Sequence, residues 1–152
     1  MSSFYIRKIL VPVDGSEYME KEIGLACTLA KMLDAEITIL HVVAVPQPTG
    51  MEALSEASRH LEEVGRKILE DARAMAERLG VSPRLDMDFS VGNPGIKIVK
   101  KAEALKADLI VIGARGRSRL REILMGSVAN TVVNNAPCPV LVVRPLEMGN
   151  GK

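Results

Sequence analysis

Aromatic residues are scarce in this chain of 152 residues, which has no Trp, two Tyr and two Phe. Little aromatic surface is therefore available to stack the bases of a single-stranded nucleic acid. An excess of charge of one sign is also lacking, because 20 basic residues against 19 acidic ones leave a net charge of +1. This balance gives no general attraction to nucleic acid or to an anionic membrane, so any anion site must be local.

Long hydrophobic runs and cysteine patterns are missing too. The N-terminus leads directly into a strand of about five apolar residues, which is too short for a signal peptide or a membrane span. We therefore expect a cytoplasmic protein with no membrane partner. Cys27 and Cys138 lack CxxC spacing, so we expect two buried, reduced thiols and neither a disulfide nor a metal site.

Apolar residues are plentiful, at 47% of the chain. That fraction is ample for a continuous core, and the length fits a single domain over residues 1–152. Apolar β-branched runs alternate with segments in which apolar residues recur every three or four positions, so strands should alternate with helices. The expected strands are Tyr5–Val13, Glu36–Val43, Arg84–Val91, Leu109–Ile112 and Val140–Val143. The expected helices are Met19–Leu33, Leu54–Leu79, Ile96–Leu105 and Ser127–Asn135.

This alternation predicts an α/β fold with a five-stranded open parallel sheet and helices on both faces. Two strand orders fit such a sheet, 2-1-3-4-5 and 3-2-1-4-5. The unbroken apolar runs Ile9–Val11 and Leu109–Ile112 favour central strands, whereas the alternating strand 84–91 suits an edge with one wet face. The side chains expected to face inward from that strand are Leu85, Met87, Phe89 and Val91. Those expected inward from the first and third helices are Met19, Ile23, Ala26, Cys27, Ala30, Leu33, Ile96, Val99, Ala102 and Leu105.

A glycine-rich stretch, Gly113–Ser127, follows a wholly apolar strand and leads into a helix. Glycines let backbone N–H groups approach an anion without a Cβ in the way, and the positive end of the helix dipole faces the same place. In the order 3-2-1-4-5, Asp14 and Gly113 leave neighbouring strands at the same end of the sheet. The stretch therefore predicts a nucleotide site.

The last strand, Val140–Val143, lies at an edge in either order. It is wholly apolar and carries no charge that would prevent association between edges. A partner that pairs with this edge across a two-fold axis would cover it. We therefore predict a homodimer built around this strand.

Three blocks of the sequence carry a family resemblance. The glycines follow the pattern Gly113-x2-Gly116-x9-Gly126-Ser127, the first strand ends in Val-Pro-Val-Asp14, and Ala-Pro-Cys-Pro139 precedes the last strand. From Lys8 to Arg144 the chain resembles the universal stress protein family, and the glycine spacing is similar to that of its ATP-binding branch. The resemblance implies a flavodoxin-related, Rossmann-like fold of order 3-2-1-4-5 and a dimer through the last strand. It also implies ATP between the first and fourth strands, with Mg²⁺ or Mn²⁺ on the phosphates.

The resemblance also implies roles for single residues. Pro12, Val13 and Asp14 would flank adenine and ribose, and Val42 would meet the base through its backbone. Backbone N–H groups at Gly116 and from Gly126 onward would meet phosphate oxygens. The residues that would line the ribose and phosphates are Gly113, Arg115, Gly116, Gly126, Ser127 and Val128.

Each residue has a plainer interpretation beside that one. Asp14 could simply start a turn before Ser16, the expected N-cap of the first helix, and Gly126 could be a tight helix entry. The arginines could form a solvated face, so we favour phosphate proximity for Arg115 or Arg117 only.

The sequence contains no motif that indicates a catalytic site. A GxxxxGK[ST] loop with its phosphate-binding Lys is missing. His41 lies in an apolar strand, so we expect a core histidine with satisfied hydrogen bonds. We expect His60 to be solvated. No His is expected near Ser16 or Ser127, so a Ser-His-Asp triad is not supported.

We therefore expect an ATP-binding regulatory or stress-response protein with slow hydrolysis at most. Leu120 stands where the family commonly has Gly, and Asn130 stands where it often has an acidic residue. These two differences weigh against ATP hydrolysis more than against ATP binding. The alternatives are a nucleotide-free dimeric interaction module, and an adenine-nucleotide hydrolase or transferase on the same fold.

Overall fold

The computed structural model describes residues 4–45, 51–114 and 125–144, and in the second helix it describes side chains from residue 56 onward. Within these residues five parallel strands form one sheet in the order β3-β2-β1-β4-β5. The predicted fold class is confirmed. Of the two strand orders that the sequence pattern left open, the structure has 3-2-1-4-5. The strands are β1 (Lys8–Pro12), β2 (Glu36–Val45), β3 (Arg84–Val91), β4 (Leu109–Gly113) and β5 (Val140–Val143).

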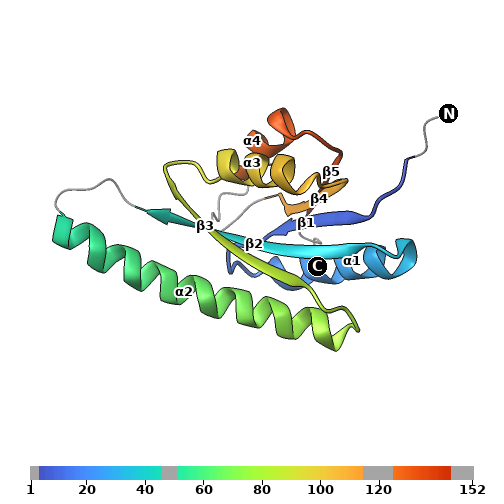
Figure 1. Ribbon diagram of the computed structural model, residues 1–152, viewed down its shortest axis with the longest axis horizontal. Coiled ribbons are helices and arrows are strands. Elements are labelled where there is room, and N and C mark those ends of the chain that lie inside the picture. The colour runs from blue at the N-terminus through green and yellow to red at the C-terminus, as the bar shows by residue number, and fades with distance from the viewer. Residues whose placement is uncertain (1–3, 46–50, 115–124, 145–152) are drawn as a thin grey trace, which may run out of the picture.

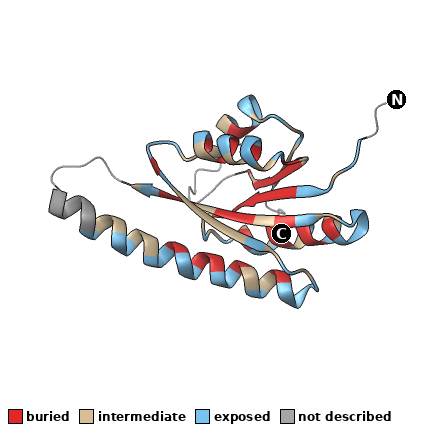
Figure 2. Cartoon of the chain, in the orientation of Figure 1, coloured by how far each residue is buried: buried red, intermediate tan, exposed pale blue. Residues whose placement is uncertain are grey.

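Helices cover both faces of the sheet. In the described part of the chain, α1 (Met19–Leu33) and α2 (Met51–Arg78) lie on one face, and α3 (Gly95–Leu105) and α4 (Ser127–Asn135) lie on the other (Figure 1). Neighbouring residues of a strand point to opposite faces, so β1 contributes Ile9 and Val11 to one core cluster and Leu10 to the other. Figure 2 shows buried residues along the central strands and on the helices that pack against them.

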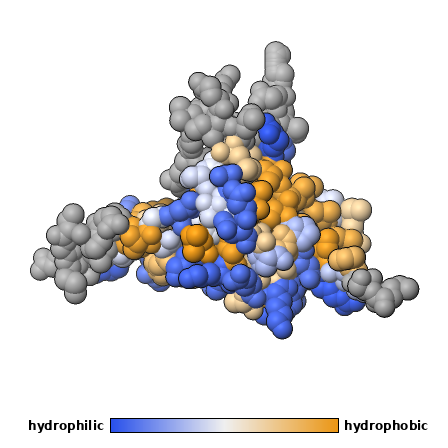
Figure 3. Space-filling view, turned by 90° about the horizontal axis from the view of Figure 1, so that it is seen from above, coloured by the Kyte–Doolittle hydropathy of each residue, from blue (hydrophilic) through white to orange (hydrophobic). Residues whose placement is uncertain are grey.

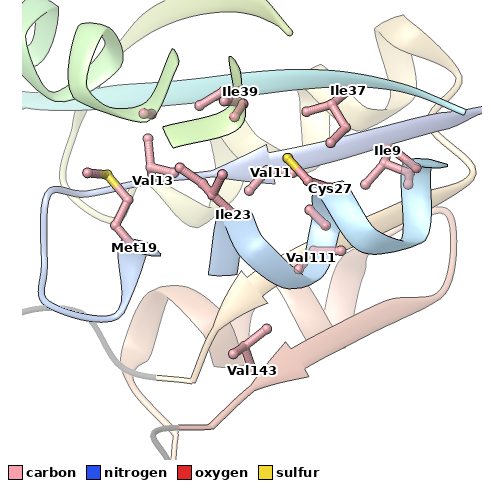
Figure 4. Packing of buried hydrophobic residues seen from close by; sticks show 14 of the residues in the cluster. Ile9, Val11, Val13, Met19, Ile23, Cys27, Ile37, Ile39, Val111 and Val143 are labelled. Atoms are coloured by element: carbon pink, nitrogen blue, oxygen red, sulfur yellow. The ribbon is translucent and has the colours of Figure 1, made fainter. Parts of the chain in front are cut away.

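The side of the sheet under α1 illustrates this packing. Ile23 and Cys27 of α1 lie against Val11 of β1 and Ile39 of β2 (Figure 4). The runs Ile9–Val11 of β1 and Leu109–Ile112 of β4 are buried and wholly apolar, as the sequence pattern predicted for central strands. Cys27 is buried as expected, whereas Cys138 is only partly buried, and both thiols are free.

Two helix positions predicted to face inward are wrong. Leu33 is 44% exposed because it is the last residue of α1, and Ile96 is 49% exposed. The buried face of α3 starts one residue earlier, at Gly95, and continues at a spacing of three and four residues. Its members are Gly95, Ile98, Val99 and Ala102.

β3 is an edge strand as predicted, but its outer end does not follow the predicted alternation. Phe89 and Val91 are 39% and 58% exposed, whereas Ser90 is buried. The reason is the position of α2, which packs mainly along β2 and covers β3 only slightly. Apolar alternation therefore identified the core side of this strand at Leu85 and Met87, which pack against the core, but not at its outer end.

Among the helices that the structure describes, none is long and apolar enough to cross a membrane. The described residues also contain no group of three His, Cys, Asp or Glu side chains that could hold a metal ion.

Candidate functional site

A cleft of about 440 Å³ opens at the carboxyl ends of the central strands. β1 and β4 are neighbours, but the chain continues from β1 to β2 on one side and from β4 to β5 on the other. The connections diverge at this point, which is where open α/β sheets bind ligands. Much of the lining comes from four segments: Pro12–Asp14, Leu40–Ala44, Ile112–Gly113 and Gly126–Ala129.

Eight of the residues predicted for the site line this one cleft. They come from β1, β2, β4 and the start of α4, which are far apart in the sequence. Arg115, Gly116 and Arg117 lie outside the described residues. The eight are Pro12, Val13, Asp14, Val42, Gly113, Gly126, Ser127 and Val128.

Asp14 occupies a turn and also faces the cleft. Its Oδ1 accepts a hydrogen bond from the Ser16 backbone N–H at 2.9 Å, which is the turn that the sequence allowed as an alternative. Ser16 is not the N-cap of α1, because a further turn delays the helix and Tyr18 takes the N-cap position without a side-chain bond. The turn uses only Oδ1, and among the described residues no partner is found for the second oxygen of Asp14, which can therefore accept from a ligand.

The start of α4 presents donors to the cleft. Gly126 is the N-cap residue, in an extended conformation (φ −73°, ψ 169°), and has no side chain to cover the first turn. Its own N–H donates to the Ala114 carbonyl at 2.7 Å, so the expectation that this N–H meets a phosphate is wrong. The first intrahelical bond is donated by Asn130 to the Gly126 carbonyl. The N–H groups of Ser127, Val128 and Ala129 therefore have no partner within the helix.

The backbone of β2 extends past the end of β1. The last hydrogen bond between β1 and β2 at this end of the sheet is donated by the Val13 N–H to the Leu40 carbonyl, at 2.8 Å. In a parallel strand, residues two positions apart direct their N–H and C=O groups to the same side. The backbone groups of Val42 therefore point into the space beyond β1, where a ligand edge fits.

His41 has one satisfied ring nitrogen. Its Nδ1 lies 2.8 Å from the Val13 carbonyl oxygen and must be the protonated nitrogen, because a carbonyl only accepts. The sequence-based interpretation as a core histidine is confirmed in this respect. His41 also lines the cleft together with Ser16 and Ser127, which the sequence did not predict.

Glu22 is the cleft residue that sequence reasoning missed most clearly. It is 3% exposed, and its pKa is raised well above the ordinary value, first by burial and then by the Asp14 carboxylate. The backbone N–H of Gly113 lowers the pKa in part. A signal was present, because Glu22 lies three residues after Met19 and four before Ala26 and so falls on the apolar face of α1.

Comparison with known proteins identifies the family. A profile of the universal stress protein family matches residues 6–144. The chain belongs to the universal stress protein family.

Relatives within the family extend over most of the chain. Universal stress protein MJ0531 of Methanocaldococcus jannaschii is 40% identical over 141 residues, which are 91% of this chain and 82% of that protein. The structure of the hypothetical protein MJ0577 superposes with a TM-score of 0.81 at 29% identity, over 92% of this chain and 96% of the other. A universal stress protein in complex with cAMP has a TM-score of 0.68 at 25% identity, over 93% and 98% of the two chains.

In this universal stress protein an Asn side chain fixes the start of α4. Asn93 Nδ2 donates to Thr131 Oγ1 at 2.9 Å, and its Oδ1 accepts from the Gly95 N–H at 2.8 Å. A Cβ on Gly95 would lie 2.7 Å from the Thr131 Cβ, so this glycine is what lets α3 approach α4. The donors of Ser127 and its neighbours are thereby held in place over the cleft.

A second glycine lets α2 lie on the cleft wall. A Cβ on Gly65 would lie 2.8 Å from His41 Cδ2 and 3.0 Å from Met87 Cε. We expect overpacking in Gly65→Ala to lower the free energy of unfolding by about 1–3 kcal/mol. The higher helix propensity of Ala offsets up to about 1 kcal/mol of this loss, so the net effect is destabilising. Urea denaturation measures the change.

Gly24 of α1 provides the matched control, because nothing lies within 4 Å of a Cβ built there. Gly24→Ala gains the helix propensity alone, so the two Gly→Ala changes should have opposite signs. Equal stabilisation by both would contradict the close contact between Gly65 and His41.

Proposed function

We propose that the cleft binds ATP or another adenine nucleotide and that the protein acts in regulation or stress response, with slow hydrolysis at most. The observation that carries the proposal is the start of α4, where a glycine N-cap leaves three N–H donors without a partner among the described residues. Such an end attracts phosphate through its donors and its dipole. The related universal stress protein in complex with cAMP supports an adenine nucleotide as the ligand.

The other parts of the cleft suit the rest of a nucleotide. Leu40, Ile98 and Ile112 provide an apolar wall for a base. The free backbone edge at Val42 can read the donor and acceptor on the base, and the second oxygen of Asp14 can accept from a ribose hydroxyl. The Ser127 hydroxyl adds a donor for the phosphates.

Mg²⁺ or Mn²⁺ would then accompany the phosphates. The carboxyl groups on the described lining of the cleft are those of Asp14 and Glu22, which are fewer than a dedicated metal cage needs. The ion would therefore be held chiefly by phosphate oxygens. Binding without rapid turnover is favoured because the sequence has no GxxxxGK[ST] loop to supply the Lys that stabilises charge in phosphoryl transfer.

The test is direct binding. The purified protein is denatured by heat and the released fraction is analysed for adenine nucleotide, and the apo protein is titrated calorimetrically with ATP, ADP, AMP and cAMP. We expect saturable binding of at least one of these and little release of phosphate from ATP. An absence of both released nucleotide and binding heat would favour the nucleotide-free interaction module, whereas turnover well above background would favour a hydrolase.

We also propose that the protein is a homodimer through β5. β5 is an edge strand, and Val140, Leu141 and Val142 stay partly exposed. Figure 3 shows a broad hydrophobic area on the face of the molecule that carries α3 and α4. An uncharged apolar edge of this kind is stabilised by pairing with a second copy.

Val142→Lys is expected to dissociate this dimer, because it places a charge on the edge that pairs. Light scattering coupled to size exclusion should report a fall to the mass of one chain, 16.5 kDa. Met32→Lys adds the same charge to an exposed position of α1, on the opposite face of the sheet, and should leave the dimer intact. If Val142→Lys retains the wild-type mass, β5 is not the interface.

A further inference from the structure

Glu22 is a buried carboxyl group that the proposed nucleotide contacts do not use. It retains 3% of its accessible surface, and within the described residues its Oε2 has no hydrogen-bond partner. A buried oxygen without a partner is costly, and an ionised one is more costly still. The structure places this group on the lining of the cleft, beside Asp14 and Gly113.

Among the described residues, the groups around Glu22 give an ionised carboxylate little compensation. Asp14, at the end of β1, contributes a like charge, and Gly113, from β4, contributes a single backbone N–H. From β2, His41 lines the same cleft, but its Nδ1 proton is donated to Val13. On α1 itself, Lys21 Nζ donates to the Arg144 carbonyl at 2.5 Å.

The side chains of α2 from residue 56 onward add no charge at this place. The α2 residues on the cleft lining are Leu61, Val64 and Ile68, all of them apolar. Burial and the Asp14 carboxylate together therefore raise the pKa of Glu22, and the Gly113 N–H offsets only part of that rise. The neutral acid is the form that this environment stabilises.

We propose that Glu22 makes nucleotide binding proton-linked: the protonated carboxyl leaves Asp14 as the only negative group of the described cleft lining, and ionisation of Glu22 weakens binding of an anionic nucleotide. The inference rests on the proposed nucleotide function and adds a regulation to it. A second negative charge inside a poorly solvated cleft repels phosphates more than it would in water. By reciprocity, a bound phosphate raises the proton affinity of Glu22, so binding at alkaline pH takes up protons.

Glu22→Gln separates this role from a structural one. The amide keeps one acceptor for the Gly113 N–H and one donor, as the neutral acid does, but it cannot ionise. The matched control is Glu20→Gln, which removes a charge from an exposed position of the same helix. ATP is titrated into all three proteins by calorimetry at half-unit intervals from pH 6 to 9, in two buffers of different ionisation enthalpy.

The measured quantity is the ratio of the Kd of the wild type to that of Glu22→Gln, because titration of the ATP phosphates is common to both proteins and cancels. We expect a ratio near one at low pH that rises by up to about tenfold per pH unit once Glu22 ionises. The wild type should take up protons on binding there, as should Glu20→Gln, whereas Glu22→Gln should not. A ratio that is constant across the pH range would overturn the inference and leave the nucleotide site standing. No binding by any of the three proteins at any pH would overturn the nucleotide site, and the inference with it.

Discussion

Replacing Gly126 by Val is expected to abolish nucleotide binding while the protein stays folded. The side chain of an N-cap residue lies over the N–H groups of the second and third helix positions. Gly126 has none, so a Val there would cover the donors of Val128 and Ala129 that a phosphate needs. Loss of two hydrogen bonds to a charged group, at about 1.5–3 kcal/mol each, corresponds to binding weaker by roughly 100-fold or more.

The fold should tolerate this change for a conformational reason. The φ of Gly126 is −73°, which any residue adopts, and the backbone bond from its N–H to Ala114 does not depend on the side chain. We therefore expect the free energy of unfolding to stay within about 1 kcal/mol of the wild type. Calorimetric titration with ATP and urea denaturation measure the two quantities on the same sample.

Gly24→Val is the matched control, since it makes the same substitution at an open position of α1 that does not line the cleft. It should bind ATP with the wild-type affinity. Unchanged affinity in Gly126→Val would show that this glycine serves the entry to α4 alone and that the nucleotide phosphates do not lie against the start of α4.

The sequence was a good guide to the fold because burial on both faces leaves a strong pattern. The runs at Ile9–Val11 and Leu109–Ile112 predicted the two central strands, and β1 and β4 occupy those places. The choice between two strand orders needed the family resemblance, since local periodicity carries no information about which strands pair. The structure then brought Asp14 and Gly113 together at one end of the sheet.

The sequence was a poorer guide to which side of an element is covered. The inward positions of Ile96 and Phe89 were wrong because burial depends on where α2 and α4 lie, which no local pattern specifies. The same limit applies to hydrogen bonds between distant segments. That the N–H of Gly126 is bound to Ala114, and that Asn93 fixes Thr131, follows only from the tertiary arrangement.

The candidate site combines two kinds of residue that the sequence treats differently. Gly126, Ser127 and Asp14 stand in a motif and could be recognised from their spacing. Glu22 stands in no motif, and its only signal is a charged residue on the apolar face of a helix. Such a residue is conspicuous because an ionised group on a buried face must be paired or neutral.

Glu22→Gln is expected to stabilise the protein increasingly as the pH rises. The pKa of Glu22 is raised in the folded state by burial and by Asp14, whereas in the unfolded chain it is the ordinary value of about 4.3. Above that value the unfolded chain loses the proton while the folded protein retains it. The unfolded state then binds fewer protons, so the stability of the wild type falls as the pH rises.

The size of this effect follows from the linkage relation. Each pH unit between the unfolded and the folded pKa lowers the wild-type free energy of unfolding by about 1.4 kcal/mol relative to Glu22→Gln. The two proteins should therefore be nearly equal in stability close to pH 4, and the difference should grow until the folded pKa is reached and stay constant above it. Urea denaturation at several pH values from 4 to 8 measures the difference, with Glu20→Gln expected to follow the wild type throughout. A difference that does not change with pH would show that folding does not raise the pKa of Glu22. A Glu22→Gln protein that is less stable than the wild type at neutral pH would show that Glu22 is ionised and paired in the folded protein, because removing the charge of a stabilised carboxylate costs free energy.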